Sequence, residues 1–287
     1  MEPIFLAEAA INGLLLGGVL ALLALGLNLI FGVIDIVWIA YVDLVMLAMY
    51  AVYFLVMVYG WPVWLAGAAG VGVGALLGIG VHLLIISPIL KSPPVNQLLA
   101  TGGLLFFIQS FATFLWSTDH KSVRLTLPIL EFGGMFLSFA RLLAFAISIL
   151  AVVGLYLFLT RTYIGTAIRA VAQDREAMAL MGADPQRVYV VTSAVGGAMA
   201  GLAAALLSIQ YSVHPFFGAA FGPITFMICV LGGLGNMPGA FVASFIMSEI
   251  ISIGGVTWST EMGYVIAFAL FIVMIFVRPG GIMARRD

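Results

Sequence analysis

The chain has 287 residues, of which 64% are apolar and only 8% are Asp, Glu, Lys or Arg, and its formal net charge is −1. Water-soluble domains are about 45–50% apolar, so this composition excludes a soluble globule. The near-zero net charge gives no electrostatic basis for binding nucleic acid. The single cysteine, Cys229, excludes an internal disulfide and is expected to be a small core residue.

Continuous apolar runs along the chain predict an all-α, polytopic membrane helix bundle, because the strands of a membrane barrel would alternate polar and apolar residues. We expect a single transmembrane domain over residues 1–287, with about nine spans and a range of eight to ten. The predicted spans are 9–31, 36–58, 63–87, 97–116, 139–160, 188–210, 218–234, 238–254 and 262–278. The segments 218–234 and 238–254 are short for a bilayer core of about 30 Å, so one of them is a candidate re-entrant segment.

The basic residues predict the orientation of these spans. One side of the nine-span arrangement receives eight of them: Lys91, Arg161, Arg169, Arg175, Arg187, Arg278, Arg285 and Arg286. The other side receives only Lys121, Arg124 and Arg141. Because cytoplasmic loops are enriched in Lys and Arg, we expect the N-terminus outside and the C-terminus inside a cytoplasmic (inner) membrane.

The most polar stretch is a predicted cytoplasmic loop at about 161–187. Within it Asp174 is a good helix N-cap, Glu176 falls in the first turn, and Gly182 is placed to end the helix. The residues between them supply an apolar stripe on about two turns, made of Ala177, Met178, Leu180 and Met181. A helix this short is not stable alone, so it must pack on something. Two alternatives stay open: an interfacial helix lying on the bilayer or on its own bundle, and a docking element for a cytoplasmic partner.

Polar residues inside the spans are candidates for a solute path. An acidic side chain at the depth of Asp43 is costly and should face the bundle interior or water. Asp43 is placed either to meet the ammonium group of a passing amino acid or to pair within the bundle. The remaining candidates serve either the path or hydrogen bonds between helices: Asn12, Asn28, Gln109 and Gln210. For Glu249 we expect a structural role at a helix interface.

Neither a metal site nor a bound cofactor is expected. His82 and His214 fall on opposite sides of the membrane, with no partner ligand three or four residues away. The glycine-rich stretches 70–80 and 232–240 lack the Lys-Ser/Thr pair of a phosphate-binding loop, so the chain should not bind ATP by itself. We expect 70–80 to serve helix packing, and the cytoplasmic loop 232–240 either to pack tightly at a sharp turn or to reach the surface of a partner.

Five blocks, in the right order along nearly the whole chain, resemble the LivH-type permease subunit of branched-chain amino-acid ABC importers. They are NGLLLGGVLALLALGLNLIFGV (12–33), LLATGGLLFFIQ (98–109), AQDREAMALMGADPQRV (172–188), VLGGLGNMPGAFVASFIMSEI (230–250) and FVRPGGI (276–282). One block departs. The family usually has an Asn-Phe-Ala-His-Gly-acid sequence where residues 38–43 here are Trp, Ile, Ala, Tyr, Val and Asp. The missing Gly would remove a helix break, and Trp38 and Tyr41 would change the width and chemistry of a nearby path.

The resemblance implies an ABC importer subunit that is not itself an enzyme and moves branched-chain amino acids or related small polar solutes. It implies three kinds of protein partner in the lipid membrane: separate ATPase subunits, a second related permease, and a periplasmic or surface solute-binding protein. The residues implied for ATPase coupling are Asp174, Glu176, Ala177, Met178, Met181 and Gly182. Those expected along the solute path are Trp38, Tyr41, Asp43, Asn12 and Gln109.

Three alternatives compete with this interpretation. The same family also serves urea, amide and aromatic-acid import, and the sequence does not name the solute. An ion-coupled secondary transporter would use Asp43 or Glu249 as a proton or Na⁺ site, but it has no need of a capped cytoplasmic helix. An intramembrane enzyme would need paired catalytic groups at one depth, and the predicted spans contain no such pair.

Overall fold

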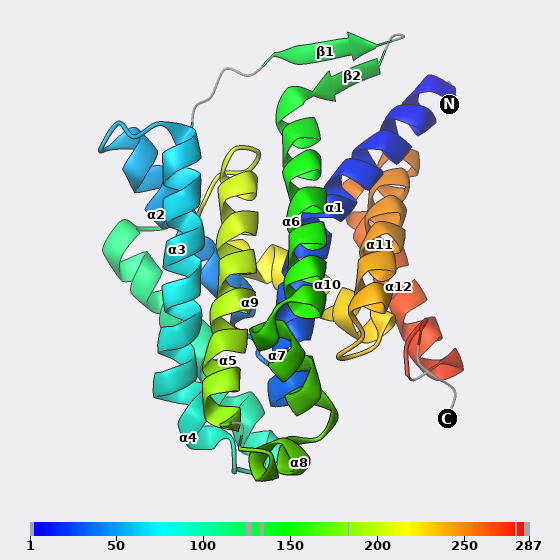
Figure 1. Cartoon of the computed structure of the whole chain (residues 1–287). Coiled ribbons are helices and arrows are strands. Elements are labelled where there is room, and N and C mark those ends of the chain that lie inside the picture. Colours follow the sequence, from blue (N-terminus) through cyan, green and yellow to red (C-terminus); the bar gives the residue numbers. More distant parts are fainter. Residues whose placement is uncertain (1–2, 124–127, 133–134, 183, 279, 284–287) are drawn as a thin grey trace.

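The computed structural model describes residues 3–123, 128–132, 135–182, 184–278 and 280–283 (Figure 1). Three basic residues that enter the charge count, Arg124, Arg285 and Arg286, lie outside these ranges. Helix α1 begins at one end of the molecule and α12 finishes at the opposite end, which also carries α8. We call these the hairpin end, where strands β1 and β2 lie, and the α8 end.

The described residues form twelve α-helices, one π-helical turn and one hairpin. The helices are α1 (Pro3–Ile34), α2 (Tyr41–Met57), α3 (Val63–Val81), α4 (Ser87–Ile89), α5 (Pro94–Trp116), α6 (Phe139–Arg161), α7 (Tyr163–Gln173), α8 (Arg175–Leu180), α9 (Pro185–Ser208), α10 (Phe217–Gly232), α11 (Met237–Thr257) and α12 (Thr260–Val277). The π-helical turn η1 (His82–Ile86) joins α3 to α4, and β1 (Ile129–Phe132) pairs antiparallel with β2 (Met135–Ser138). The predicted all-α membrane bundle is confirmed, and the hairpin is an addition that the sequence analysis missed.

Each of the nine predicted spans coincides with an apolar helix. Seven helices in the described part of the chain are long and apolar enough to cross a membrane, while α2 and α10 are shorter. Of the two segments predicted to be short, only α10 is, with 16 residues; α11 has 21. At 1.5 Å per residue, α10 covers about 24 Å, less than a bilayer core of about 30 Å.

Helix α1 is the centre of the bundle. It packs against α6, α9, α10 and α11, and residues from Leu20 to Ala24 are almost completely buried. A helix that is apolar on every side belongs in a protein core or across a membrane, and α1 is the membrane helix that the other helices cover most fully. The other long helices are apolar too, but they expose more of their surface, as expected for helices that face lipid.

Helices α3 and α9 pack with their backbones in close contact, as predicted for the glycine-rich stretch 70–80. A Cβ atom at Gly74 would collide with the carbonyl of Gly197, and one at Gly78 with the carbonyl of Ser193. The contact is reciprocal, because a Cβ atom at Gly201 would strike the carbonyl of Gly70. Small residues let membrane helices approach this closely.

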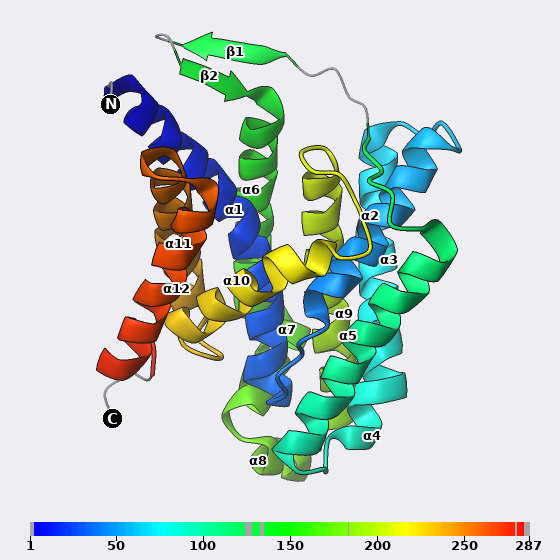
Figure 2. The ribbon, with the colours of Figure 1, turned by 180° about the vertical axis from the view of Figure 1, so that it is seen from behind.

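Helices α2 and α10 begin inside the bundle and not at its ends (Figure 2). Residues 35–40, which follow α1, are not helical, and α2 starts only at Tyr41, so the predicted span 36–58 is a non-helical segment followed by a helix. The helix break therefore lies upstream of Val42, which is itself helical. We expected the lack of a glycine at position 42 to remove a helix break. A break is nevertheless present, just before α2.

The loops at the hairpin end are tied together. Lys121 and Val213 exchange two backbone hydrogen bonds of 2.9 and 2.8 Å, joining the segment after α5 to the segment after α9. The rings of His120 and His214 lie 4.5 Å apart between centroids. Burial and then the neighbouring His120 lower the pKa of His214, which favours its neutral form.

Candidate functional site: an internal cavity and a capped helix

A cavity of about 590 Å³ lies where α1, α2, α5 and α10 meet. Its lining is largely apolar: Leu27, Val37, Trp38, Ile39, Tyr41, Val42, Leu98, Leu105, Phe106, Gln109, Gly218, Ala219, Gly222, Pro223 and Phe226. Three residues predicted for the solute path, Trp38, Tyr41 and Gln109, thus line one space.

Asp43 is buried beside this cavity and is joined to it through Gln109. Only 1% of Asp43 is exposed, and its Oδ1 accepts a hydrogen bond of 3.0 Å from Nε2 of Gln109. The sequence left open whether Asp43 meets the ammonium group of a solute or pairs within the bundle. In the structure Asp43 is paired within the bundle, with Gln109. The carboxylate also lies in the first turn of α2, where the partial positive charge of the helix N-terminus stabilises an anion.

The first turn of α10 approaches the same carboxylate. A Cβ atom at Gly218 would lie 2.6 Å from Oδ1 of Asp43, so only glycine fits there without displacement. The N-terminal ends of α2 and α10 therefore converge on one acidic side chain inside the bundle. Sequence reasoning missed Gly218 and its neighbours, although Gly222-Pro223 inside a short apolar segment is the signal that marks broken membrane helices.

Tyr41 and Trp38 form the aromatic part of the lining. The hydroxyl of Tyr41 donates a 2.9 Å hydrogen bond to the carbonyl of Gly196 on α9, which fixes the ring. Trp38 packs edge-on against Tyr41, with centroids 6.0 Å apart. Its Nε1 is buried and has no hydrogen-bond partner among the described residues. A buried donor of this kind costs about 1–3 kcal/mol, so its position needs an explanation.

Asn12 is not part of this cavity. Its Oδ1 accepts a 2.6 Å hydrogen bond from Arg141, and it lines a separate cavity of about 350 Å³ at the hairpin end. The structure therefore separates Asn12 from the other predicted path residues. Glu249 lies against α1, where a Cβ atom at Gly13 would be 2.9 Å from Oε2, in line with a position at a helix interface.

The capped helix of the polar loop is present as α8. Oδ1 of Asp174 accepts hydrogen bonds from the backbone N–H groups of Glu176 (3.0 Å) and Ala177 (2.9 Å), as expected of an N-cap. Gly182 has φ +85°, a left-handed conformation that ends a helix and suits glycine. The preceding helix α7, capped by Thr162, was not predicted.

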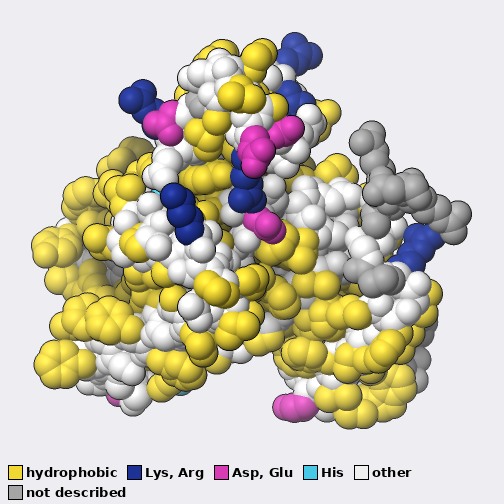
Figure 3. All heavy atoms as spheres, turned by 90° about the horizontal axis from the view of Figure 1, so that it is seen from below, with side chains coloured by type: hydrophobic (Ala, Val, Ile, Leu, Met, Phe, Trp, Pro, Cys, Tyr) yellow, Lys and Arg dark blue, Asp and Glu magenta, His cyan; other side chains and the backbone are white. Residues whose placement is uncertain are grey.

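The apolar residues of α8 do not share one environment. Met178 packs against the core, whereas Leu180 and Met181 are 90% and 84% exposed. The predicted stripe is thus split between the bundle and the outside. Arg175 lies 3.7 Å from Asp35 and links α8 to the end of α1. Figure 3 shows that most of the charged side chains in this view lie together in its upper middle, with apolar surface mainly below them and to the sides.

Apolar helices, two short helices that start inside the bundle, and a partly open cavity beside a buried acid define a polytopic membrane transport protein. The family model described as branched-chain amino acid transport system / permease component matches residues 9–275. The chain belongs to this permease family.

Several relatives match along almost their entire length. The chain is 28% identical to the high-affinity branched-chain amino acid transport system permease protein BraD of Pseudomonas aeruginosa, over 98% of this chain and 96% of the relative. It is 27% identical to LivH of Escherichia coli K12, over 99% and 97% of the two chains. A probable LivH of Methanocaldococcus jannaschii is 25% identical over 94% and 90%. No solved structure matches significantly.

Proposed function

We propose that residues 1–287 form a single transmembrane permease domain of an ABC importer. Its solutes are branched-chain amino acids or closely related small polar molecules, which it passes across the cytoplasmic membrane. The observation that carries this proposal is the family match over residues 9–275, together with relatives of the same transport system that align over at least 90% of both chains.

Energy comes from separate ATPase subunits that dock on the segment Asp174–Gly182. Leu180 and Met181 support this role, because two large apolar side chains that are 90% and 84% exposed beside charged residues form an anchor for a protein pocket. The cap at Asp174 holds the short helix in shape before it docks. A second, related permease and an external solute-binding protein complete the importer.

The solute passes the cavity formed by α1, α2, α5 and α10. Its volume of about 590 Å³ lies within the range of small-molecule sites, about 300–1,000 Å³. Leu27, Leu105 and Phe106 offer an apolar surface to an aliphatic side chain. The Asp43–Gln109 pair offers an acceptor to an ammonium group, and Nε1 of Trp38, which has no hydrogen-bond partner among the described residues, offers a donor to a carboxylate.

The hairpin end faces outward and the α8 end faces the cytoplasm. Basic residues support this orientation, because Arg161, Arg169, Arg175 and Arg187 all belong to segments near α8.

Met181→Arg tests the docking of α8. A charge on this exposed side chain disturbs no packing in the bundle but should prevent insertion into an apolar pocket of an ATPase. We expect uptake of labelled leucine, in cells that make all subunits, to fall at least about tenfold, which corresponds to a change of roughly 1.4 kcal/mol in the coupled step. The amount of the chain in the membrane should not change.

Gln186→Arg is the matched control, because Gln186 is also exposed near the α8 end but lies on α9. Uptake by this control should stay within about twofold of the unmodified chain, well below a full tenfold step. Normal uptake by the Met181→Arg variant at normal expression would exclude docking through α8.

A further inference from the structure

Two cavities adjoin at the α8 end, and they differ in character. The first, about 470 Å³, is lined mainly by apolar residues of α1, α6, α7 and α11, among them Leu29, Ile168 and Met237. The second, about 700 Å³, has a more polar lining that includes Asp35, Gln173 and Arg175. Five residues line both spaces: Gly32, Arg169, Ala172, Gly235 and Asn236. Together they form an amphipathic space with an apolar and a polar compartment.

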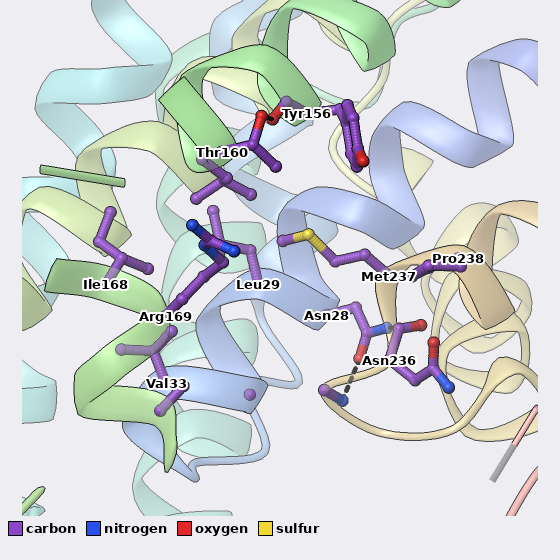
Figure 4. Close-up of a pocket in the computed structure, with 14 residues that line it drawn as sticks. Asn28, Leu29, Val33, Tyr156, Thr160, Ile168, Arg169, Asn236, Met237 and Pro238 are labelled. Carbon is purple, nitrogen blue, oxygen red and sulfur yellow. Dashed lines mark hydrogen bonds between the residues drawn. The ribbon is translucent and has the colours of Figure 1, made fainter. Parts of the chain in front are cut away.

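Arg169 stands at the boundary between the compartments. Figure 4 shows its side chain reaching from α7 into the apolar cavity, toward Leu29 and Thr160. Within the described ranges, the ion pairs at this end join Arg175 to Asp35 and Arg187 to Asp184, and neither includes Arg169. Its guanidinium group therefore offers a positive charge to an anion inside the cavity.

The cavity lies beside the ends of two long apolar helices, α1 and α6. Thr160 immediately precedes Arg161, the last residue of α6, and Leu29 is five residues from the end of α1. Tyr156 on the rim is 65% exposed, so the apolar compartment opens toward the outside of the bundle. Tyrosine and arginine are favoured at the membrane–water boundary, where lipid headgroups lie.

One wall of the cavity is built rigidly. The Asn28 side chain donates hydrogen bonds to the carbonyls of Asn236 (2.9 Å) and Gly233 (3.3 Å) and accepts one of 2.6 Å from the N–H of Gly235. The last of these is drawn in Figure 4. These bonds fix the α10–α11 turn against α1, so the space does not depend on a ligand to form.

We propose that this joint cavity binds one anionic phospholipid from the leaflet at the α8 end. The phosphate pairs with Arg169, and an acyl chain lies along Leu29, Ile168 and Met237. Arginine binds phosphate through charge-assisted hydrogen bonds, and basic pockets between membrane helices are known to select anionic headgroups. An amphipathic ligand fits because the apolar compartment holds its acyl chain and the polar compartment holds its charged headgroup.

The test measures lipid binding to the purified full chain in mixed micelles, so it does not depend on transport or on the proposed function. Phosphatidylglycerol, phosphatidylcholine and inorganic phosphate serve as probes, and native mass spectrometry reports the bound lipid. We expect phosphatidylglycerol to bind at least about fivefold more tightly than phosphatidylcholine, and Arg169→Gln to remove this preference, as for the loss of one basic contact.

Two further variants make the result specific. Arg161→Gln removes a charge at the same end from a residue that lines neither cavity, and it should change the affinity by less than about twofold, because surface charge contributes little beyond the site. Thr160→Phe fills the apolar compartment and should weaken phosphatidylglycerol binding without changing the net charge. Both variants should keep the unfolding temperature of the unmodified chain.

Three results would each overturn the proposal. One is wild-type phosphatidylglycerol affinity in the Arg169→Gln variant. A second is an equal loss in Arg161→Gln, which would show attraction to surface charge alone. The third is displacement of the lipid by inorganic phosphate at equal concentration together with no effect of Thr160→Phe, which would show that the polar compartment takes a free anion.

Discussion

Asp43 is a carboxylate inside a membrane bundle, and three neighbours offset its loss of water. The amide of Gln109 donates a hydrogen bond, the first turn of α2 supplies partial positive charge, and the start of α10 comes within contact at Gly218. The first turn of α2 is local to Asp43, whereas Gln109 and Gly218 lie far from it in the sequence. An acid at this position is therefore visible in the sequence, but its partners are not, because they depend on how α2, α5 and α10 pack.

Trp38 carries the first prediction at this scale. Trp38→Phe keeps an aromatic ring but removes the Nε1 donor that has no partner among the described residues. If that donor binds the solute carboxylate, the KM for uptake should rise about tenfold or more, since a hydrogen bond to a charged group contributes roughly 1.5–3 kcal/mol. The variant loses no internal hydrogen bond, but the smaller ring leaves a void in a fully buried position, so we expect a moderate fall in the unfolding temperature.

Trp116→Phe is the control for this prediction. Trp116 stacks on Tyr50 with centroids 4.1 Å apart and does not line the cavity. Its replacement should leave the KM unchanged. The KM is measured from the concentration dependence of uptake. A normal KM in the Trp38→Phe variant would show that the indole N–H does not bind the solute.

The close contact between helices α3 and α9 requires glycine at the positions where their backbones meet. Gly197→Ala places a Cβ atom against the carbonyl of Gly74, so the two helices must move apart. Overpacking of this kind costs about 1–3 kcal/mol, and we expect a lower unfolding temperature for the purified chain. Gly72→Ala on α3 is the control, since a Cβ atom there meets nothing within 4 Å. Equal unfolding temperatures for the two variants would contradict the close packing.

Hydropathy predicts where this chain is apolar, and that is not the same as where it is helical. The nine apolar segments all correspond to helices, because long apolar runs in a membrane must satisfy their backbone internally. Residues 36–39 are equally apolar, and Ile36 and Trp38 are only 1% exposed, yet they are not helical. A segment that borders a cavity and is partly buried in the bundle can leave the helical conformation, and no hydropathy window detects this.

The capped helix was more predictable than the cavity. Asp174 and Gly182 act through local hydrogen bonds and local backbone conformation, so their spacing in sequence was sufficient to place the helix. The division of its apolar residues was not predictable, because Met178 faces the bundle through tertiary packing. The β1–β2 hairpin was missed because strands of four residues give too short an alternation to recognise.

For the molecule as a whole, orientation is the property that charge alone predicts. In a chain with Cys229→Ala, Asp119→Cys at the hairpin end should react with a membrane-impermeant maleimide on intact cells. Gln186→Cys at the α8 end should react only after permeabilisation. Both positions are exposed, and Cys229 is completely buried, so its replacement leaves the labelled surface unchanged. The reverse labelling pattern would invert the topology.

The central claim is that this permease imports amino acids with energy from ATP. The direct measurement is uptake of labelled leucine into proteoliposomes of known orientation. They contain the chain, its permease partner and its ATPase subunits, and the binding protein is added outside. We expect uptake that requires internal ATP and the binding protein and that is unaffected by collapsing proton and Na⁺ gradients. Uptake driven by an ion gradient without ATP would contradict the account and would identify a secondary transporter.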